Sequence, residues 1–168
     1  MGVRNQVGWI PCARNQRERQ TKPLFRKRKS FNRQYQHVFD ALRDLPQNTV
    51  VDGEIVALDD AGRPNFNFLQ HSRSQAKRIH YFVFDLLVYE NRDLMHLSFV
   101  ERREILKSKV KFQSPRVRTA DYFETPAATM LQSAREQDLE GVVAKRKNSL
   151  YEAGKRSGAW AKFRLNSG

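Results

Sequence analysis

The chain has 168 residues, a single cysteine and a formal net charge of +13. A single cysteine excludes an intramolecular disulfide and a cysteine-based zinc site, and no apolar run reaches the roughly 18 residues that a membrane-spanning helix needs. A charge this large favours a polyanionic partner, most often a nucleic acid.

The first 30 residues differ from the rest of the chain. They are polar, rich in Arg, Gln and Asn, and show no sustained period, and residues 26–29 form a dense basic run. This composition is typical of a disordered arm, and the basic run also resembles a localisation signal.

Regular patterns begin near residue 34. Apolar residues at helical spacing predict a first helix that ends at Pro46. Residues 49–58 and 80–89 are predicted strands, and the first of them is followed by a turn signal at residues 59–62.

In the second half of the chain, predicted helices and strands follow one another without strict alternation. Residues 91–93 are a predicted turn, and Ser98 with Glu101 forms a capping box for a helix that reaches about residue 109. A further helix is expected from Thr125 to about residue 137, with Pro126 at its first position, before strands at 141–147 and 159–165. This order predicts an α+β fold with mixed, largely antiparallel sheets and packed helices.

The two last predicted strands carry the most informative charges. Glu140 and Lys145 lie five residues apart on one apolar run, and Lys162 lies on the next. If the two runs pair in a sheet, the three side chains can converge on one polyphosphate, because a carboxylate suits a divalent metal and lysines suit phosphate oxygens. Taken alone, the first run would also fit an ordinary strand with charged ends.

A series of motifs in fixed order makes the chain resemble the adenylation domain of ATP-dependent DNA ligases. The resemblance covers about residues 26–164 and is greatest to the ligase module of bacterial end-joining ligases. It is carried by V-D-G-E-I-V-A-L at 51–58, G-R-P-x-F at 62–66, Y-F-V-F-D-L-L at 81–87, E-R-R at 101–103, E-G-V-V-A-K at 140–145 and W-A-K-F-R at 160–164.

The resemblance implies an ATP-grasp-like nucleotidyltransferase domain that uses ATP and Mg²⁺ (or Mn²⁺). In this family a lysine attacks the α-phosphate of ATP and carries AMP, the AMP passes to a 5′-phosphate on nicked double-stranded DNA, and the 3′-hydroxyl displaces it. The implied setting is DNA repair and recombination in the bacterial cytoplasm, associated with the nucleoid, with end-joining proteins as partners and no membrane.

The resemblance also assigns nucleotide-binding roles to several residues. Glu54 matches the carboxylate that contacts the sugar and supports the metal step, Phe84 matches the aromatic that stacks on adenine, and Asp85 supports the same region. Without the motif order, Phe84 would be read as an ordinary core residue.

Other residues match the family's phosphate and metal contacts. Glu140 is the candidate metal ligand and Lys145 a phosphate contact, while Lys162 matches the first lysine of W-x-K-x-K, which contacts the α-phosphate. Arg164 stands where that motif has its second lysine, and an arginine keeps the charge but not the shape. Arg26 matches the arginine of an S-R motif, although Phe25 replaces the serine.

The family's nucleophile motif, K-x-D-G, does not occur in this chain. A one-base forward shift of the reading frame explains its absence, because permitted codons for the fourteen residues 3–16 can then read F-E-I-K-L-D-G-Y-R-A-L-A-I-K. We therefore expect residues 1–25 to be an aberrant or disordered arm translated out of frame, and residues 26–168 to be a truncated adenylation domain. If residues 1–25 cannot replace the family's nucleophile strand and its neighbours, an edge of the sheet stays open.

This interpretation predicts a ligase fragment without ligase activity. Covalent AMP cannot form by the family route without the lysine, and the OB-fold domain that such ligases close on DNA is expected to be missing as well. Two alternatives remain open: a non-catalytic basic nucleic-acid-binding protein, and another lysine nucleotidyltransferase of the RNA ligase or capping type.

Overall fold

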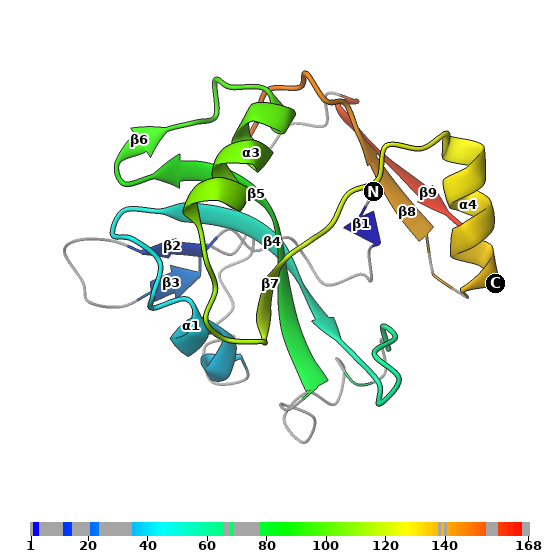
Figure 1. The fold of residues 1–168 in the computed structure, drawn as a ribbon, viewed down its shortest axis with the longest axis horizontal. Helices are drawn as coiled ribbons and strands as arrows, with labels where there is room; N and C mark the ends of the chain where they lie inside the picture. Colours follow the sequence, from blue (N-terminus) through cyan, green and yellow to red (C-terminus); the bar gives the residue numbers. More distant parts are fainter. Residues whose placement is uncertain are drawn as a thin grey trace.

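Two β-sheets with helices packed against them make up the computed structural model (Figure 1). It describes residues 2–3, 12–14, 21–23, 35–65, 68, 78–137, 139, 141–153 and 158–165. Arg26 and Glu140, both predicted site residues, lie outside the described residues.

The larger sheet has the strand order β3-β2-β4-β5-β6, and β7 pairs with β5. All its pairings are antiparallel except that of β5 with β7. Its strands are β2 (Cys12–Arg14), β3 (Thr21–Pro23), β4 (Val50–Ala57), β5 (Ile79–Tyr89), β6 (Arg92–Asp93) and β7 (Val117–Thr119).

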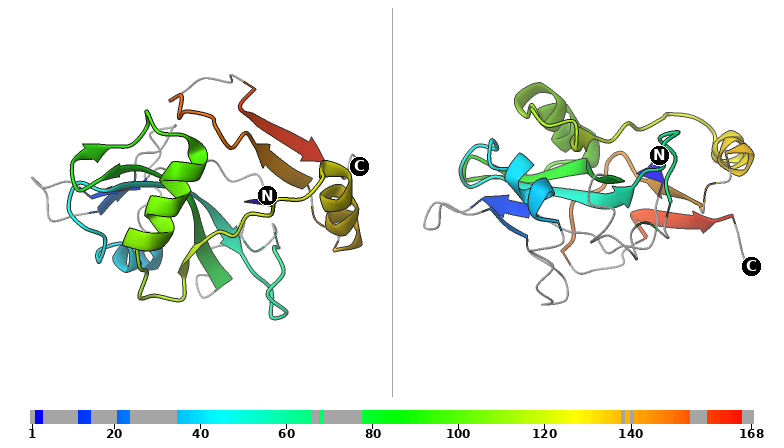
Figure 2. Two further views of the ribbon diagram at one scale, coloured as in Figure 1. Left: turned by 45° about the horizontal axis from the view of Figure 1, so that its top comes forward. Right: turned by 90° about the horizontal axis from the view of Figure 1, so that it is seen from below.

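The smaller sheet is antiparallel, with the order β1-β8-β9. It comprises β1 (Gly2–Val3), β8 (Gly141–Lys145) and β9 (Trp160–Arg164). Helix α3 (Phe99–Lys109) lies over the larger sheet and α4 (Ala127–Glu136) lies beside the smaller one, while the short α1 (Gln36–Ala41) precedes β4 (Figures 1 and 2). In the part of the chain that the structure describes, no helix is long and apolar enough to cross a membrane.

Alternation along β4 and β5 separates the core from the opposite face of the sheet. Ile55, Tyr81 and Val83 are almost fully buried in the hydrophobic core together with residues of α1 and α3. At Gly53 a Cβ atom would lie 2.6 Å from the carbonyl oxygen of Phe82, so this position of the strand admits only glycine.

Most predicted elements are present, and the differences have local causes. Helix α1 ends at Ala41, before the predicted end at Pro46. The residues between them form turns, and these turns place Leu45 in the core without a continued helix. Pro126 is the N-cap of α4 and not its first residue. The predicted turn at 91–93 is wrong in part: Glu90 and Asn91, both at positive φ, form the tight turn, and residues 92–93 pair as β6.

The N-terminal segment contributes short strands to both sheets. Cys12 pairs with Val51 and Ala13 with Val50, so this part of β4 is not left as an open edge of the sheet. The proposed boundary at residue 25 stays a prediction, because several residues around it are outside the described part of the chain.

A buried ion pair joins α3 to β5. The Arg102 guanidinium donates two hydrogen bonds of 2.8 Å to the carboxylate of Asp85, and both side chains are fully buried. Its Nη1 also donates to the carbonyl oxygens of Leu97, at 2.6 Å, and Ser149, at 3.4 Å. Because Ser149 follows β8, one side chain connects the larger sheet, the helix and the end of a strand in the smaller sheet.

A second buried carboxylate lies near this pair. The Tyr151 hydroxyl donates to Oδ2 of Asp52 at 3.3 Å. Burial raises the pKa of Asp52 to about 7, and the negative charge of Asp85 adds to the rise while the positive charge of Lys145 opposes it. Burial also raises the pKa of the Tyr151 hydroxyl above its ordinary value.

We expect Arg102→Met to lower the free energy of unfolding by about 3–5 kcal/mol, because Asp85 would remain buried without its counter-charge. The double variant Asp85→Leu/Arg102→Met should recover much of this loss. The control is Arg43→Met, whose ion pair with Asp40 is exposed (64% and 45%) and should contribute less than about 1 kcal/mol. Urea denaturation measures all three, and an equal loss for Arg102→Met and Arg43→Met would contradict the prediction.

The raised pKa of Asp52 should make the chain less stable as the pH rises. In the window from the ordinary value of 3.8 to about 7, the folded chain binds the Asp52 proton and the unfolded chain does not. The free energy of unfolding therefore falls across this window, by a few kcal/mol in total. Asp52→Asn should remove this decrease.

The measurement is denaturation of both proteins between pH 4.5 and 8 without nucleotide. His37 and His80, whose pKa values burial lowers, are present in both proteins, so the difference between the two curves isolates Asp52. The exposed Asp44→Asn is the control. A constant difference between wild type and Asp52→Asn across this range would contradict the assignment.

Candidate functional site

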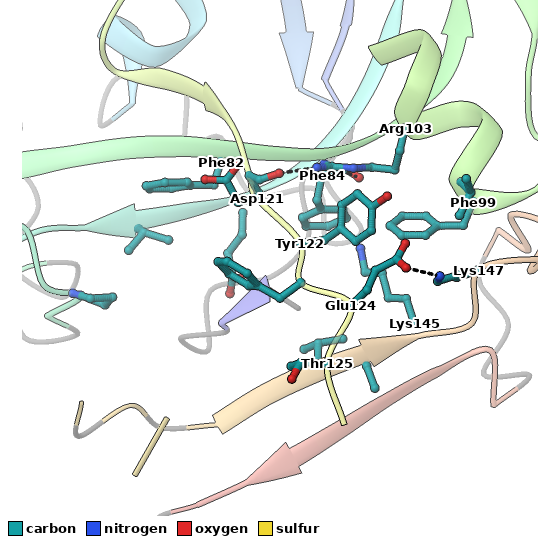
Figure 3. A pocket seen from close by; sticks show the side chains of 18 of the residues that line it. Phe82, Phe84, Phe99, Arg103, Asp121, Tyr122, Glu124, Thr125, Lys145 and Lys147 are labelled. Atoms are coloured by element: carbon teal, nitrogen blue, oxygen red, sulfur yellow. Dashed lines mark hydrogen bonds and ion pairs between the residues drawn. The ribbon is translucent and has the colours of Figure 1, made fainter. Parts of the chain in front are cut away.

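A cavity of about 470 Å³ lies between the larger sheet and β8 (Figure 3). Its wall combines parts of β4, β5, the start of α3, residues 120–125 and β8. Known small-molecule sites have cavities of roughly 300–1,000 Å³ with mainly apolar walls and a few polar groups. This cavity has the size and the lining of such a site.

One wall is formed by side chains of β4 and β5 that point away from the core. Glu54 and Val56 line it from β4, and Phe82 and Phe84 line it from β5. Glu54 is only 5% exposed, so its carboxylate is largely withdrawn from bulk water. The sequence predicted a role for Glu54 and Phe84, and the fold brings both to the same cavity.

The opposite wall comes from β8. Val143 and Lys145 line the cavity, and their partners on β9 are Lys162 and Trp160. The predicted pairing of the two runs is therefore confirmed. Directly paired residues project to the same face of a sheet, so Lys162 lies on the face of Lys145, although it does not itself line the cavity.

The two walls meet at Lys145 and Phe84. The ammonium nitrogen of Lys145 lies 3.5 Å from the centroid of the Phe84 ring. A predicted phosphate contact and a predicted base platform, 61 residues apart in the sequence, thus touch across the cavity.

Arg103 and Tyr122 also line the cavity, and the motif analysis did not select them. Arg103 is 1% exposed and donates to the carbonyl oxygens of Phe84, at 3.2 Å, and Ala120. Its guanidinium also lies 5.3 Å from the Tyr122 ring. Burial lowers the pKa of Arg103, but a guanidinium stays protonated at neutral pH. The E-R-R motif could have indicated Arg103, whereas no pattern pointed to Tyr122.

Two other predicted site residues, Asp85 and Arg164, do not line the cavity. Asp85 is paired with Arg102 in the interior, so it acts on the site only through the positions of α3 and β5. Arg164 is exposed and pairs with Gly141 across the smaller sheet. Arg26 and Glu140 are outside the described residues.

The donor atoms around the cavity are compatible with Mg²⁺ only in the presence of a phosphate ligand. The described residues contain no group of three or more His, Cys, Asp or Glu side chains that could hold a metal. Glu54, Asp121 and Glu124 each line the cavity. Mg²⁺ commonly binds through one or two carboxylates together with phosphate oxygens and water, so it does not require a closed protein cage.

Sequence comparison identifies close relatives of this chain. It is 33% identical over 123 residues to the multifunctional non-homologous end joining protein LigD of Mycolicibacterium smegmatis, which covers 73% of this chain and 16% of that protein. It is 32% identical over 122 residues to the SPbeta prophage-derived DNA ligase-like protein LigB of Bacillus subtilis, which covers 71% of this chain and 45% of that protein. The chain thus spans less than half the length of either relative.

A solved structure has the same fold. Mycobacterial DNA ligase D, complexed with ATP and MES, superposes with a TM-score of 0.76 at 26% identity, over 93% of this chain and 50% of that one. The agreement confirms the predicted α+β architecture of mixed, largely antiparallel sheets.

A sequence profile for a known domain matches almost the whole chain. The profile describes the ATP dependent DNA ligase domain and aligns with residues 11–164. Together with the motif order and the shared fold, this match shows that the chain belongs to the family of ATP-dependent DNA ligase domains.

Proposed function

We propose that the cavity is an ATP site in which adenine stacks on Phe84, Glu54 contacts the ribose, and Lys145 and Lys162 contact the phosphates. The observation that carries the proposal is the meeting of Phe84 and Lys145 across one cavity. A flat apolar ring suits a base, and an ammonium suits phosphate oxygens. The distribution of charge supports this orientation, because Lys162 lies next to Val143 on the same face of the smaller sheet.

A divalent metal, Mg²⁺ or Mn²⁺, completes the proposed site. When bound with the nucleotide it would neutralise the charge on the phosphate oxygens. Glu140 is the proposed ligand, since it directly precedes β8 in the sequence, and Glu54 is a described candidate on the cavity wall. Asp85 and Arg102 hold β5 and α3 in place around the nucleotide.

The proposed biological role is sealing of nicked double-stranded DNA through an enzyme–AMP intermediate, in repair and recombination. The relative from Mycolicibacterium is named as an end joining protein, which supports end-joining proteins as partners. The bacterial cytoplasm, near the nucleoid, is the corresponding location. These assignments concern a whole ligase, of which this chain resembles one domain.

This chain itself is proposed to bind ATP without reacting with it. It contains no K-x-D-G, while residues 3–16 can encode that motif in the next reading frame. A nucleophilic lysine must be held at the phosphate and activated by its surroundings. Residues 1–25 would then be an out-of-frame replacement for the nucleophile segment, and residues 26–168 would retain the nucleotide-binding part of the domain.

A second function, binding to nucleic acid without catalysis, is favoured by one surface. Lys107, Lys109, Lys111 and Arg118 are exposed around the end of α3, and no acidic residue occurs between residues 105 and 120. Phosphate backbones bind such surfaces with strong salt dependence. This function does not exclude ATP binding, because none of these four basic residues lines the cavity.

We expect Lys145→Ala and Phe84→Leu each to weaken ATP binding by about tenfold. The first variant removes a charge-assisted contact, and the second removes the stacking face, and each such contact is worth about 1–3 kcal/mol. Isothermal titration calorimetry with ATP and Mg²⁺ measures the effect. Lys111→Ala, an exposed change outside the cavity, is the control. Unchanged ATP affinity in both cavity variants would refute the proposed site.

We expect intact-mass spectrometry to find no covalent AMP on this chain after incubation with ATP and Mg²⁺, and a nicked-duplex assay to find no sealing. The cause is tested by reading the nucleotide sequence of codons 1–25 from freshly isolated source DNA. The forward-shifted frame should encode K-x-D-G. Covalent labelling of the chain would show that another residue serves as the nucleophile, and a shifted frame without the motif would contradict the reading-frame explanation.

A further inference from the structure

The ammonium group of Lys145 is enclosed by three aromatic rings. Its Nζ atom lies 3.5 Å from the ring centroid of Phe84, 3.7 Å from that of Trp160 and 4.9 Å from that of Phe99. The atom is buried from solvent. We call these three rings the aromatic cage.

The cage is built from three elements that the fold holds together. Trp160 is the direct cross-strand partner of Lys145, which places both side chains on one face of the smaller sheet. The rings of Phe84 and Phe99 contact Trp160 edge to face, with centroids 5.7 and 6.4 Å away. These are ordinary distances for stabilising aromatic pairs.

Backbone hydrogen bonds fix the position of Phe99, the third ring of the aromatic cage. The amide of Phe99 donates to the carbonyl of Ser149 at 2.9 Å, and that of Val100 donates to the carbonyl of Lys147 at 3.1 Å. The start of α3 is thereby attached to the segment that follows β8, so Phe99 keeps its position relative to Lys145. The cage is a structural feature of the site and not a chance contact of a flexible lysine.

The position of the cation bears directly on base binding. An ammonium 3.5 Å above a ring centroid occupies the space in which a stacked base would lie on that face. Phe84 is the proposed base platform, and Lys145 lines the same cavity. A ligand that stacks its base there must first displace the ammonium, and a ligand with phosphates supplies a strong anionic partner for the displaced Lys145.

We propose that Lys145, held in the aromatic cage, is a specificity-determining residue that makes the site favour nucleoside triphosphates, whose phosphates can bind the displaced ammonium, over nucleosides, which carry no phosphate. The inference rests on the proposed ATP site. Adenosine must displace the ammonium from the rings and has no phosphate group that could bind it. ATP expels the same cation but binds it again through its phosphate oxygens, in a charge-assisted hydrogen bond. Trp160 and Phe99 act as positioning residues, because they hold the cation over the platform.

The test compares the dissociation constants of adenosine and ATP. Lys145→Met keeps the length of the side chain and removes its charge, so we expect adenosine to bind about tenfold more tightly and ATP about tenfold more weakly. The matched control is Lys147→Met, which changes a lysine that lines the cavity but pairs with Glu124 outside the cage. Ligand-observed NMR measures adenosine, and calorimetry measures ATP.

The role of the cage is tested separately with Trp160. Trp160→Leu should raise adenosine affinity about threefold when Lys145 is present and have no effect in the Lys145→Met background. Trp160→Phe, which keeps a ring, should behave as wild type. Phe99→Leu replaces Trp160→Leu if that variant does not fold. In the free wild-type chain the ε-CH₂ protons of Lys145 should show upfield ring-current shifts, which Trp160→Leu reduces.

Opposite signs for the two ligands in Lys145→Met would support the inference, since a general loss of structure would weaken both. If ATP binds but adenosine affinity is unchanged in Lys145→Met, the base does not compete with the cation, and this inference fails while the ATP site stands. If the wild-type chain binds no ATP, the proposed function fails and this inference fails with it.

Discussion

The geometry of the nucleotide cavity depends on the buried pair between Arg102 and Asp85. Removing two charges from water is costly, and the pair is tolerated because the guanidinium makes four hydrogen bonds: two to the carboxylate, and two to backbone carbonyls at 2.6 and 3.4 Å. Those carbonyls belong to the loop before α3 and to the segment after β8. An apolar substitute could fill the same volume, but it could not fix these three chain segments relative to one another. The pair therefore determines where the two walls of the cavity stand.

Charge interactions also connect this ion pair with the cavity, through Asp52 and Lys145. Asp85 is neutralised by Arg102, whereas Asp52 has no such ion pair among the described residues: it accepts a hydrogen bond from the Tyr151 hydroxyl and is stabilised by the more distant positive charge of Lys145. The interior thus holds one satisfied carboxylate and one whose ionisation is unfavourable. Displacement of Lys145 toward phosphate would withdraw a positive charge from Asp52 and favour its protonated form further. In the proposed ATP site, nucleotide binding and the protonation of Asp52 would therefore be coupled through Lys145.

Sequence patterns predicted the strands that form the cavity and three residues of its wall, Glu54, Phe84 and Lys145, because motif order and strand periodicity are local signals. They could not predict the cage. Phe99 was recognisable only as the residue after a helix cap, and its contact with Lys145 depends on hydrogen bonds to residues some fifty positions away. The short parallel strand β7 was missed for the same reason, since three residues carry no measurable period and their pairing with β5 is purely tertiary.

Under the proposed reading-frame shift, the N-terminal segment would keep the fold and lose the reaction. Strand β2 pairs with β4 through backbone groups at Cys12 and Ala13, and such hydrogen bonds are available to almost any sequence. A frame-shifted segment can therefore occupy the edge of the sheet. Catalysis has no such tolerance, because nucleophilic attack requires one amine at one position. The residues of the cavity wall all lie between Glu54 and Lys147, beyond the altered segment. The proposed shift of the reading frame near the start of the chain would thus separate nucleotide binding, which those residues would still provide, from nucleotidyl transfer, which they would not.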